Sequence, residues 1–396
     1  MANNNPVILG GARTPFGKFG GSLASLSAIE LGATAMREAM ERSKIKTDDV
    51  THNIMGCVIQ GGLGQVPSRQ AAFKAGLGRE VTSDTINRVC GSGMRAVTLA
   101  SDLVNMGHHR LIVAGGMESM SNAPFYSFGT RWGLRMGNGE LVDGMMHDGL
   151  TDPLMKVAMG NHGSTVAAEE KCSREEQDAW AYRSHRRALA AIDNGNMAQE
   201  IVPITIKDKK KGDIVISTDE SPRRETSLEA LAKLRPAFQA DGTVTAGNAP
   251  GINDGAAALV VASAEYAKSN GLKPMARILG YGEAAWDTPY LAYVPAMAGQ
   301  NALKKLGMIV EDLDLIEINE AFASVALISM ARLGVHEDKV NVNGGAVALG
   351  HPIGASGARL VLTLIHELTR RGGGIGMAAI CSGTAQGDAI IIQVGE

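Results

Sequence analysis

The stretch Gly91–Val97, which reads Gly-Ser-Gly-Met-Arg-Ala-Val, has a counterpart at 355–361, which reads Ala-Ser-Gly-Ala-Arg-Leu-Val. Each copy continues through an apolar helical pattern to a glycine-flanked strand, at 111–116 in the first half and at 377–383 in the second. A helix followed by a buried strand is a building block of layered α/β structure. The match therefore predicts that the chain contains two similar α/β units.

A second match lies upstream of the first, at nearly the same offset. Ile-Lys-Thr-Asp-Asp-Val at 45–50 corresponds to Met-Ile-Val-Glu-Asp-Leu at 308–313, and a strand-like stretch follows each copy. Two matches in the same order and at nearly one offset are hard to obtain by chance, and self-similarity of this kind indicates a repeated structural unit. We expect a duplicated core.

Strands and helices alternate along both halves. We expect strands near 7–11, 52–59, 83–88, 110–115, 313–319, 339–343 and 375–381, and helices near 25–42, 66–76, 91–106, 296–306, 322–333 and 356–370. Strands that are separated by helices favour layered α/β structure, in which helices cover the faces of the sheets.

The region between the two copies has a different character. It is more charged and less periodic, and Ser173–Glu176 forms a capping-box sequence that predicts the start of a helix running to about Asp193. The chain returns to a buried strand near 256–262. We therefore divide the chain into a first core half, 1–119, completed by 251–270, a loop domain at 120–250, and a second core half at 271–396.

Composition and charge exclude several classes of partner. The chain has 396 residues and a net charge of −3, and only 4% of its residues are aromatic. Its densest basic run, Lys207–Lys211, is short, has no aromatic neighbours and is followed by Gly212 and Asp213, which favours a solvated hairpin tip over an anion-binding patch. We expect no nucleic-acid partner.

The N-terminal apolar run Val7–Leu9 is far too short for a signal peptide or a membrane span, and the C-terminal residues are not a peroxisomal address. We expect a cytoplasmic protein with no membrane partner. The four cysteines, at 57, 90, 172 and 381, form no CxxC pair and no metal-like spacing with histidine. We expect neither a disulfide scaffold nor a metal site, so each thiol is either buried filler or a reactive group.

Cys90 stands where a strand ends and a helix begins, with Gly91 and Gly93 on either side of Ser92. The positive end of a helix dipole lowers the pKa of a thiol, and the glycines leave backbone N–H groups open to a substrate oxygen. We therefore expect Cys90 to be a nucleophile with a lowered pKa, although strand–Cys–helix turns also occur for packing reasons.

The equivalent loop of the second half contains His351, between Gly350 and Pro352. The duplication places this loop opposite Cys90, which makes His351 a candidate base for the thiol. A second cysteine, Cys381, ends the last major strand expected near 375–381, at the edge of the core where ligands of α/β sheets tend to bind. Asn319 follows the strand expected at 313–319 and suits a helix N-cap, a role compatible with positioning a water or His351.

Several of these stretches resemble the signatures of the thiolase family. They are Asn-Arg-Val-Cys-Gly-Ser-Gly at 87–93, Ala-Gly-Asn-Ala-Pro-Gly-Ile-Asn-Asp-Gly-Ala at 246–256, Asn-Glu-Ala-Phe-Ala at 319–323, Asn-Gly-Gly-Ala at 343–346, and Gly-His-Pro-Ile-Gly-Ala-Ser-Gly-Ala-Arg at 350–359. The resemblance runs from Pro6 nearly to the end. It implies the thiolase fold, a duplicated, layered α-β-α-β-α core of two similar halves with an inserted loop domain.

The resemblance also implies roles for individual residues. Cys90 would be acylated by a thioester, His351 would activate it, and Cys381 would be a second acid/base. Asn319, through a water, would form one oxyanion hole with His351, and the backbone N–H groups of Cys90 and Gly383 would form the other.

Coenzyme A would be a substrate and product, with no covalently bound cofactor. It would lie across the loop domain, where Arg223 would contact the phosphates or the adenine end. The other residues that we assign to substrate or coenzyme A binding are Met159, Phe238, Ala246 and Pro250. The partners implied are acyl-CoA, coenzyme A and further copies of the chain, because the stretch near 125–145 looks like the loop through which thiolases form tetramers; a dimer stays the alternative.

Departures from the family pattern leave the acyl substrate open. Ser382, Thr384 and Ala385 stand around Gly383, where thiolases usually carry glycines, and Ala158 stands where short-chain acetoacetyl-CoA thiolases often carry histidine. We predict acetyl transfer between CoA thioesters, that is, condensation of two acetyl-CoA and the reverse thiolysis. The alternative is a broad-range degradative 3-ketoacyl-CoA thiolase of fatty-acid metabolism.

Two further alternatives belong to other classes. A decarboxylating ketoacyl synthase would lack a second active-site cysteine, so Cys381 argues against it. A non-catalytic acyl-CoA or lipid carrier on the same fold would have lost Cys90, His351 or Cys381, and all three are present.

Overall fold

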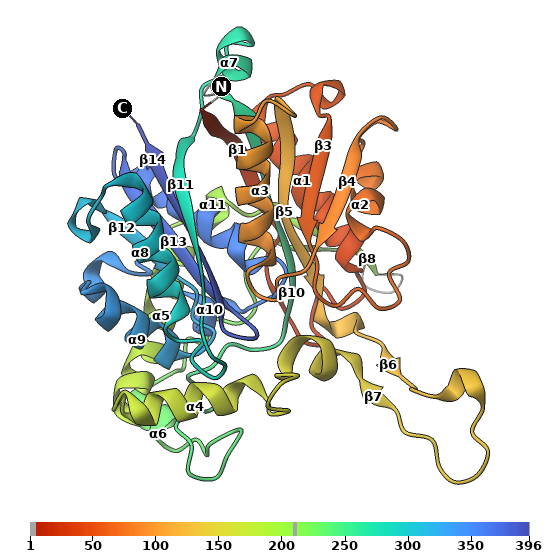
Figure 1. Ribbon diagram of the computed structural model, residues 1–396, viewed down its shortest axis with the longest axis vertical. Coiled ribbons are helices and arrows are strands. Elements are labelled where there is room, and N and C mark those ends of the chain that lie inside the picture. The colour runs from red at the N-terminus through yellow and green to blue at the C-terminus, as the bar shows by residue number, and fades with distance from the viewer. Residues whose placement is uncertain (1–4, 209–211, 396) are drawn as a thin grey trace.

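The computed structural model describes residues 5–208 and 212–395, and its main element is one sheet (Figure 1). The strands of this sheet follow the order β12 (Leu315–Ile318), β13 (Gly374–Ser382), β14 (Gln386–Val394), β11 (Ala276–Ala285), β1 (Pro6–Arg13), β10 (Asn253–Ser263), β5 (Leu111–Ser119), β3 (His52–Gly56) and β4 (Thr82–Ile86), with β2 (Gly17–Lys18) beside β10.

The two ends of this sheet repeat one pattern of pairing. In the first half β3 runs parallel to β5, and β5 is antiparallel to β10, which is antiparallel to β1. In the second half β12 runs parallel to β13, and β13 is antiparallel to β14, which is antiparallel to β11. The halves join where β1 pairs with β11, through Val7 opposite Arg277 and Ile8 opposite Ala276. The predicted duplicated core is confirmed.

Helices cover both faces of each half. The helices of the core are α1 (Ala28–Ser43), α2 (Pro67–Ala75), α3 (Ser92–Asn105), α7 (Ala264–Ser269), α8 (Val294–Leu306), α9 (Ala323–Leu333), α10 (Ala346–Leu349) and α11 (Ser356–Arg370). Successive strand residues point to opposite faces. Leu111 and Val113 of β5 therefore pack in the cluster of α1 and α2, whereas Ile112 and Ala114 pack in the cluster of α3 and α11.

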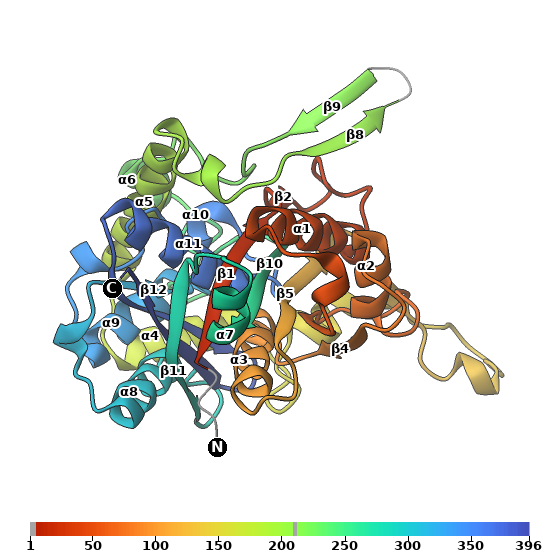
Figure 2. The same cartoon turned by 90° about the horizontal axis from the view of Figure 1, so that it is seen from above.

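The strands of the second half divide their side chains in the same way. Ala378 and Ile380 of β13 face the cluster of α3 and α11, and Met377 and Ala379 face α8 and α9. The helices α3 and α11 thus lie between the two halves of the sheet, and the order of layers is α-β-α-β-α, as predicted (Figure 2).

The two repeated stretches meet at the start of these central helices. A Cβ added at Gly93 would lie 2.9 Å from the backbone N of Ala358, and one added at Gly357 would lie 2.4 Å from the backbone N of Met94. The glycine shared by both repeats is therefore required for the close approach of α3 and α11. Because α3 follows the turn that contains Cys90 and α11 follows the loop that contains His351, this contact brings the two loops together.

The described residues between 120 and 250 add no strand to the main sheet. They form β6 (Phe125–Tyr126), β7 (Val142–Asp143), α4 (Met159–Glu169), α5 (Arg174–Asp193), β8 (Ile204–Asp208), β9 (Gly212–Ile216) and α6 (Leu228–Ala232). The predicted capping box of α5 is present, since Ser173 and Glu176 exchange hydrogen bonds between side chain and backbone. The β6–β7 arm and the β8–β9 hairpin both project from the body (Figures 1 and 2).

Several details differ from the prediction. The strand expected at 339–343 is reduced to an isolated bridge between Val340 and Ile316, because the backbone of 341–345 turns into the loop that precedes α10. Strands β11 and β14 and helix α4 were not predicted. The hairpin expected around Lys207–Lys211 is present as β8 and β9, but Lys209, Lys210 and Lys211 lie outside the described residues. No helix of the described residues is long and apolar enough to cross a membrane.

Candidate active site

The histidine and the two cysteines that the sequence indicates as catalytic line one cavity of about 410 Å³. Cys90 reaches it from the turn between β4 and α3, His351 from the loop before α11, and Cys381 and Gly383 from the end of β13. The repeat brings these segments together, because α3 and α11 begin side by side between the two halves of the sheet.

Cys90 lies directly before Gly91, the N-cap of α3, and is only partly exposed. Burial, and to a smaller extent the charge of Glu118, raises the pKa of the Cys90 thiol to about 12. The backbone N–H groups of Cys90 and Gly383 act in the opposite direction and lower this pKa. The expected lowered pKa is therefore wrong, because the desolvation of the thiolate outweighs the helix N-terminus. Cys90 is therefore a protonated thiol, and it needs a base before it can act as a nucleophile.

The side chain of His351 is held as a neutral base. Its Nδ1 lies 2.6 Å from Ser356 Oγ, which itself donates to the Pro352 carbonyl at 2.9 Å. The serine proton is thus committed to Pro352, so Nδ1 carries the imidazole proton and Nε2 presents its lone pair. Burial and the nearby Arg359 charge lower the pKa of His351 to about 3.

Asn319 lies behind His351 and is fully buried. Its Nδ2 is 3.4 Å from His351 Nε2, and its Oδ1 has no partner among the described residues. Asn319 follows the end of β12, and the helix α9 begins only at Ala323, with Phe322 as its N-cap. The predicted N-cap role is therefore wrong, whereas the predicted proximity to His351 is present.

Cys381 and Gly383 approach Cys90 from the other half of the core. Burial, followed by the charge of a Cys90 thiolate, raises the pKa of Cys381 well above its ordinary value. The lowering effect of the Gly383 N–H on the Cys90 thiol means that this N–H faces the sulfur. Both thiols are free and hold their protons in the resting state.

Ser382, noted in the sequence only as a departure from glycine, links the two cysteine segments. Its Oγ accepts the N–H of Gly91 at 3.0 Å and donates to the carbonyl oxygen of Arg88. Arg88 in turn bonds Glu283 and Asp388 on β11 and β14. Ser382 therefore fixes the Cys90 turn against the end of β13.

Backbone strain flanks both cysteines. Val89 has φ 44, Thr384 has φ 58 and Ala385 has φ 47, in a region that L-residues other than glycine rarely adopt. Thr384 Oγ1 donates to the Gly383 carbonyl at 2.6 Å. The chain thus keeps the left-handed turn that glycine would favour while adding side chains to the wall beside Gly383.

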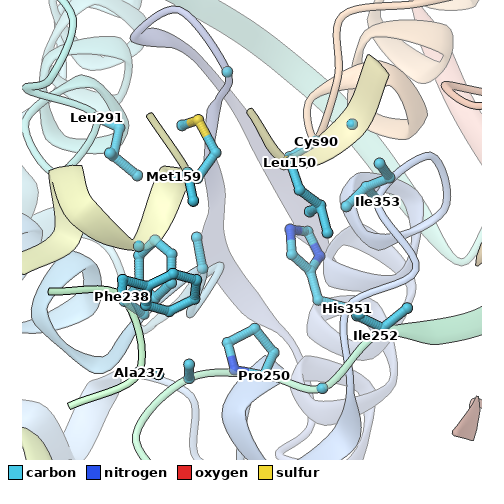
Figure 3. A pocket seen from close by; sticks show the side chains of 18 of the residues that line it. Cys90, Leu150, Met159, Ala237, Phe238, Pro250, Ile252, Leu291, His351 and Ile353 are labelled. Atoms are coloured by element: carbon cyan, nitrogen blue, oxygen red, sulfur yellow. The ribbon is translucent and has the colours of Figure 1, made fainter. Parts of the chain in front are cut away.

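The residues predicted to bind the substrate all line the same cavity: Arg223, Met159, Phe238, Ala246 and Pro250. Figure 3 shows Cys90 and Met159 toward one end and Ala237 and Pro250 toward the other, with His351 between them. Arg223 Nη2 lies 3.4 Å from the carbonyl oxygen of Ala246. The walls are mostly apolar, and Leu150, Ile252, Leu291 and Ile353, which sequence reasoning missed, complete them.

A second cavity, of about 470 Å³, adjoins the first and shares with it Val89, Gly149, Met159 and Gly383. Its other lining residues are more polar and include Gln60, Asn87, His147, Asp148, Asp152 and Thr384. Of the residues predicted to bind coenzyme A, only Met159 also lines this second cavity. The second cavity therefore lies toward the Cys90 end of the first.

Sequence reasoning also missed Glu118, which is fully buried near the end of β5. The available signal was a carboxylate directly after the apolar stretch 111–117, where an unpaired charge is costly. Among the described residues no group of three or more His, Cys, Asp or Glu side chains is arranged to hold a metal ion.

Comparison with known proteins supports the same interpretation. Residues 6–265 match the family model of the thiolase N-terminal domain, and residues 272–394 match that of the thiolase C-terminal domain. The chain is 47% identical to an acetyl-CoA acetyltransferase of Syntrophomonas wolfei, with 98% of each chain covered, and 48% identical to one of Chromobacterium violaceum, with 98% and 99% covered. The crystal structure of the Bacillus anthracis acetyl-CoA acetyltransferase superimposes with a TM-score of 0.96 at 43% identity, covering 99% of both chains. This chain belongs to the thiolase family.

Proposed function

We propose that this enzyme transfers an acetyl group between CoA thioesters through an acyl-enzyme on Cys90, joining two acetyl-CoA to acetoacetyl-CoA and catalysing the reverse thiolysis. The observation that carries the proposal is the convergence of Cys90, His351, Cys381 and Gly383 on one cavity. Relatives that match nearly the full chain are named acetyl-CoA acetyltransferases.

In the first half-reaction His351 Nε2 takes the proton of the Cys90 thiol while the sulfur attacks the acetyl carbonyl carbon. The backbone N–H groups of Cys90 and Gly383 stabilise the negative oxygen of the transition state, and each contributes about 3 kcal/mol. The carbon–sulfur bond to coenzyme A then breaks, and the leaving thiolate takes a proton from Cys381. The raised pKa of Cys381 means that its thiol still holds this proton when the leaving thiolate forms.

In the second half-reaction the Cys381 thiolate removes a proton from the α-carbon of the second acetyl-CoA. A water held by Asn319, together with protonated His351, stabilises the enolate oxygen. The enolate carbon attacks the acetyl carbon on Cys90, the bond to sulfur breaks, and His351 returns its proton to the Cys90 thiolate. Both thiols and the neutral imidazole are restored, so the cycle balances.

Coenzyme A enters from the side of Arg223, Phe238, Ala246 and Pro250, with Met159 beside the acyl group. Arg223 is placed for an anionic phosphate because a guanidinium forms strong charge-assisted hydrogen bonds. No metal or other cofactor takes part in this scheme.

The second cavity supports a second candidate, a wider range of 3-ketoacyl chains. An acyl group on Cys90 that is longer than acetyl has space beyond Val89 and Gly383, on the side away from the coenzyme A residues. Thiolysis rates against 3-ketoacyl-CoA chain length test this candidate. A rate that collapses beyond four carbons restricts the enzyme to acetoacetyl-CoA.

The proposal extends to organisation and location. A loop domain at 120–250 between core halves at 1–119, completed by 251–270, and 271–396 is supported by the pairing of β10 into the first half of the sheet. A homotetramer is supported by the projecting β6–β7 arm and its exposed apolar residues. A cytoplasmic location and a place in fatty-acid metabolism remain predictions.

The test of the main proposal is mass spectrometry of the protein after mixing with acetyl-CoA. We expect one acetyl group on the peptide that contains Cys90, and none on Cys57 or Cys172. Absence of the acetyl group from Cys90 would refute the proposed mechanism. A coupled assay for acetoacetyl-CoA formation then distinguishes acylation from complete turnover.

A further inference from the structure

Glu118 is a buried carboxylate that the proposed mechanism does not use. It lies near the end of β5 with none of its surface exposed. Among the described residues no arginine, lysine or histidine forms an ion pair with it. A buried charge without a counter-ion is costly unless hydrogen bonds compensate for it. The groups that donate hydrogen bonds to Glu118 therefore indicate the role of this carboxylate.

Those donors are backbone N–H groups from two loops. Oε2 accepts the N–H of Val58 at 3.1 Å and that of Gly354 at 2.9 Å. Oε1 accepts the N–H of Ile59 at 3.1 Å, and the Cys57 sulfur lies 3.9 Å away. Residues 57–59 follow β3 in the first half of the core, whereas Gly354 belongs to the His351 loop of the second half. One side chain thus binds loops from both halves.

The contact with the His351 loop is close-packed. A Cβ added at Gly354 would lie 2.7 Å from Glu118 Oε2, and one added at Gly116 would lie 1.8 Å from the Gly354 carbonyl oxygen. Gly354 follows Ile353, which lines the catalytic cavity, and is three residues from His351. Any displacement of Gly354 therefore moves the wall that contains His351.

The contact with 57–59 leads to the Cys90 turn. Asn87 Nδ2 donates a hydrogen bond to the carbonyl oxygen of Val58 at 3.4 Å, and the N–H of Val89 donates to Asn87 Oδ1 at 2.8 Å. Val89 is the strained residue directly before Cys90. A chain of hydrogen bonds thus runs from Glu118 through Val58 and Asn87 to the nucleophile turn.

Only a carboxylate satisfies this site in full. An ionised carboxyl group accepts hydrogen bonds at about four lone-pair positions and donates none. A glutamine of the same size would direct its amide N–H₂ at a backbone N–H, and that donor would lose its partner in a buried place. The negative charge is therefore part of the arrangement.

We propose that Glu118 is a positioning residue for the acetyl transfer: its ionised carboxylate holds the Cys90 turn and the His351 loop in a fixed relative position across the two halves of the core. This inference rests on the proposed function, because positioning matters only if the proton passes from Cys90 to His351. A group misplaced by about 1 Å in such a pair costs on the order of 100-fold in rate.

The electrostatics of the site agree with the geometry. The charge of Glu118 raises the pKa of Cys90 further, after the larger effect of burial. Burial raises the pKa of Glu118 to about 7, although the three backbone N–H groups and Cys57 lower it. The titratable groups of the adjoining segments are Cys57 after β3, Cys90 before α3 and His351 before α11. Arg88, beside Cys90, is occupied by Glu283 and Asp388.

The test uses Glu118→Gln and Glu118→Asp, with Asp49→Asn as a matched control that loses a carboxylate bonded to Tyr266 and Arg110, away from the cavity. We expect Glu118→Gln to lower kcat for acetoacetyl-CoA thiolysis about 100-fold with little change in KM. Glu118→Asp keeps the charge but is shorter, so we expect a smaller loss. Asp49→Asn should keep the wild-type rate.

A second readout separates positioning by a charged group from a merely structural role. The rate of Cys90 alkylation by iodoacetamide against pH reports the thiol pKa. Glu118→Gln should lower that pKa, whereas Glu118→Asp and Asp49→Asn should leave it near the wild-type value. An unchanged alkylation profile in Glu118→Gln, or a kcat within about threefold of wild type, overturns the proposal.

The wild-type protein provides a measurement that needs no variant to fold. The logarithm of the Cys90 alkylation rate, plotted against pH, should change slope near pH 7, because Glu118 is protonated and loses its charge as the pH falls through this value. A constant slope from pH 5.5 to 9 contradicts the inference. Alkylation needs no acyl-CoA. Failure of the proposed function therefore shows as absent acetylation of Cys90, independently of these profiles.

Discussion

Ser382 Oγ accepts the backbone N–H of Gly91 at 3.0 Å, so the strand that ends with Cys381 is fastened to the turn that contains Cys90. The same oxygen donates to the carbonyl of Arg88, on the other side of the cysteine. The relative position of the two thiols is thus set by one hydroxyl group where thiolases usually carry glycine.

We predict that Ser382→Ala slows acetylation of Cys90. The substitution removes both hydrogen bonds of this hydroxyl and leaves the Gly91 N–H with the Arg88 carbonyl oxygen, 3.0 Å away, as its remaining partner. Loss of these bonds costs about 1 kcal/mol and loosens the turn. The acetylation rate, measured by quenched-flow mass spectrometry, and the free energy of unfolding in urea should both fall. Ser173→Ala, which removes the N-cap of α5 outside the cavity, should lower stability but leave the acetylation rate unchanged. Equal rates in both variants would contradict the role of Ser382.

Cys381→Ser should separate the two half-reactions. A serine hydroxyl is too weak an acid/base for the α-proton, so we expect Cys90 to be acetylated while the condensation rate falls at least ~100-fold. Intact-protein mass spectrometry and a condensation assay measure the two steps on one sample. Full turnover by the serine variant would refute the acid/base role, and Cys172→Ser is the control for loss of a half-buried thiol at another place.

Acidification should destabilise the fold through His351. Because burial lowers the pKa of His351 to about 3, the native state binds fewer protons than the unfolded state, whose histidine has a pKa of about 6.5. Unfolding is therefore favoured as the pH falls from about 6.5 toward 3. The free energy of unfolding should decrease less steeply in His351→Ala than in the wild type over this range. Identical slopes in urea titrations would show that His351 does not titrate on unfolding.

Arg13 should be a main link between the core and residues 120–250. It is fully buried in β1 and bonds Glu200 at 2.6 Å and Asp219 at 2.7 Å. Arg13→Met leaves two carboxylates without their cation, and breaking a buried pair costs about 3–5 kcal/mol. Thermal unfolding measures the loss. Arg224→Met, which breaks an exposed pair with Asp193, is the control and should change the melting temperature little.

The β6–β7 arm should mediate the association of subunits. Trp132 is 85% exposed and Met136 is 97% exposed, and large exposed apolar side chains of this kind mark interaction sites. We expect the double variant Trp132→Glu, Met136→Glu to form smaller oligomers than the wild type by light scattering after gel filtration. Met106→Glu, at an exposed apolar residue after α3, should leave the mass unchanged. A wild-type mass in the arm variant would exclude the arm from the interface.

Much of the fold could be predicted because the chain repeats itself. The glycine common to 91–97 and 355–361 marks where α3 and α11 touch, and the alternation of apolar stretches placed most core strands and helices. Strands β11 and β14 were missed because neither has a counterpart in the stretches that were compared. The turn at 341–345 interrupts an apolar pattern, and a pattern cannot show that backbone pairing stops there.

The sequence by itself determined that Cys90, His351 and Cys381 belong to segments that a duplicated core brings together, since residue order and spacing decide which loops precede the repeated helices. Only the tertiary structure decided the chemistry of those residues. The pKa of Cys90 depends on how completely its thiol is removed from water, and burial outweighs the helix terminus that the sequence displays. The roles of Ser382 and Glu118 likewise depend on bonds to residues far away in the chain, and such distances arise only when both halves have packed.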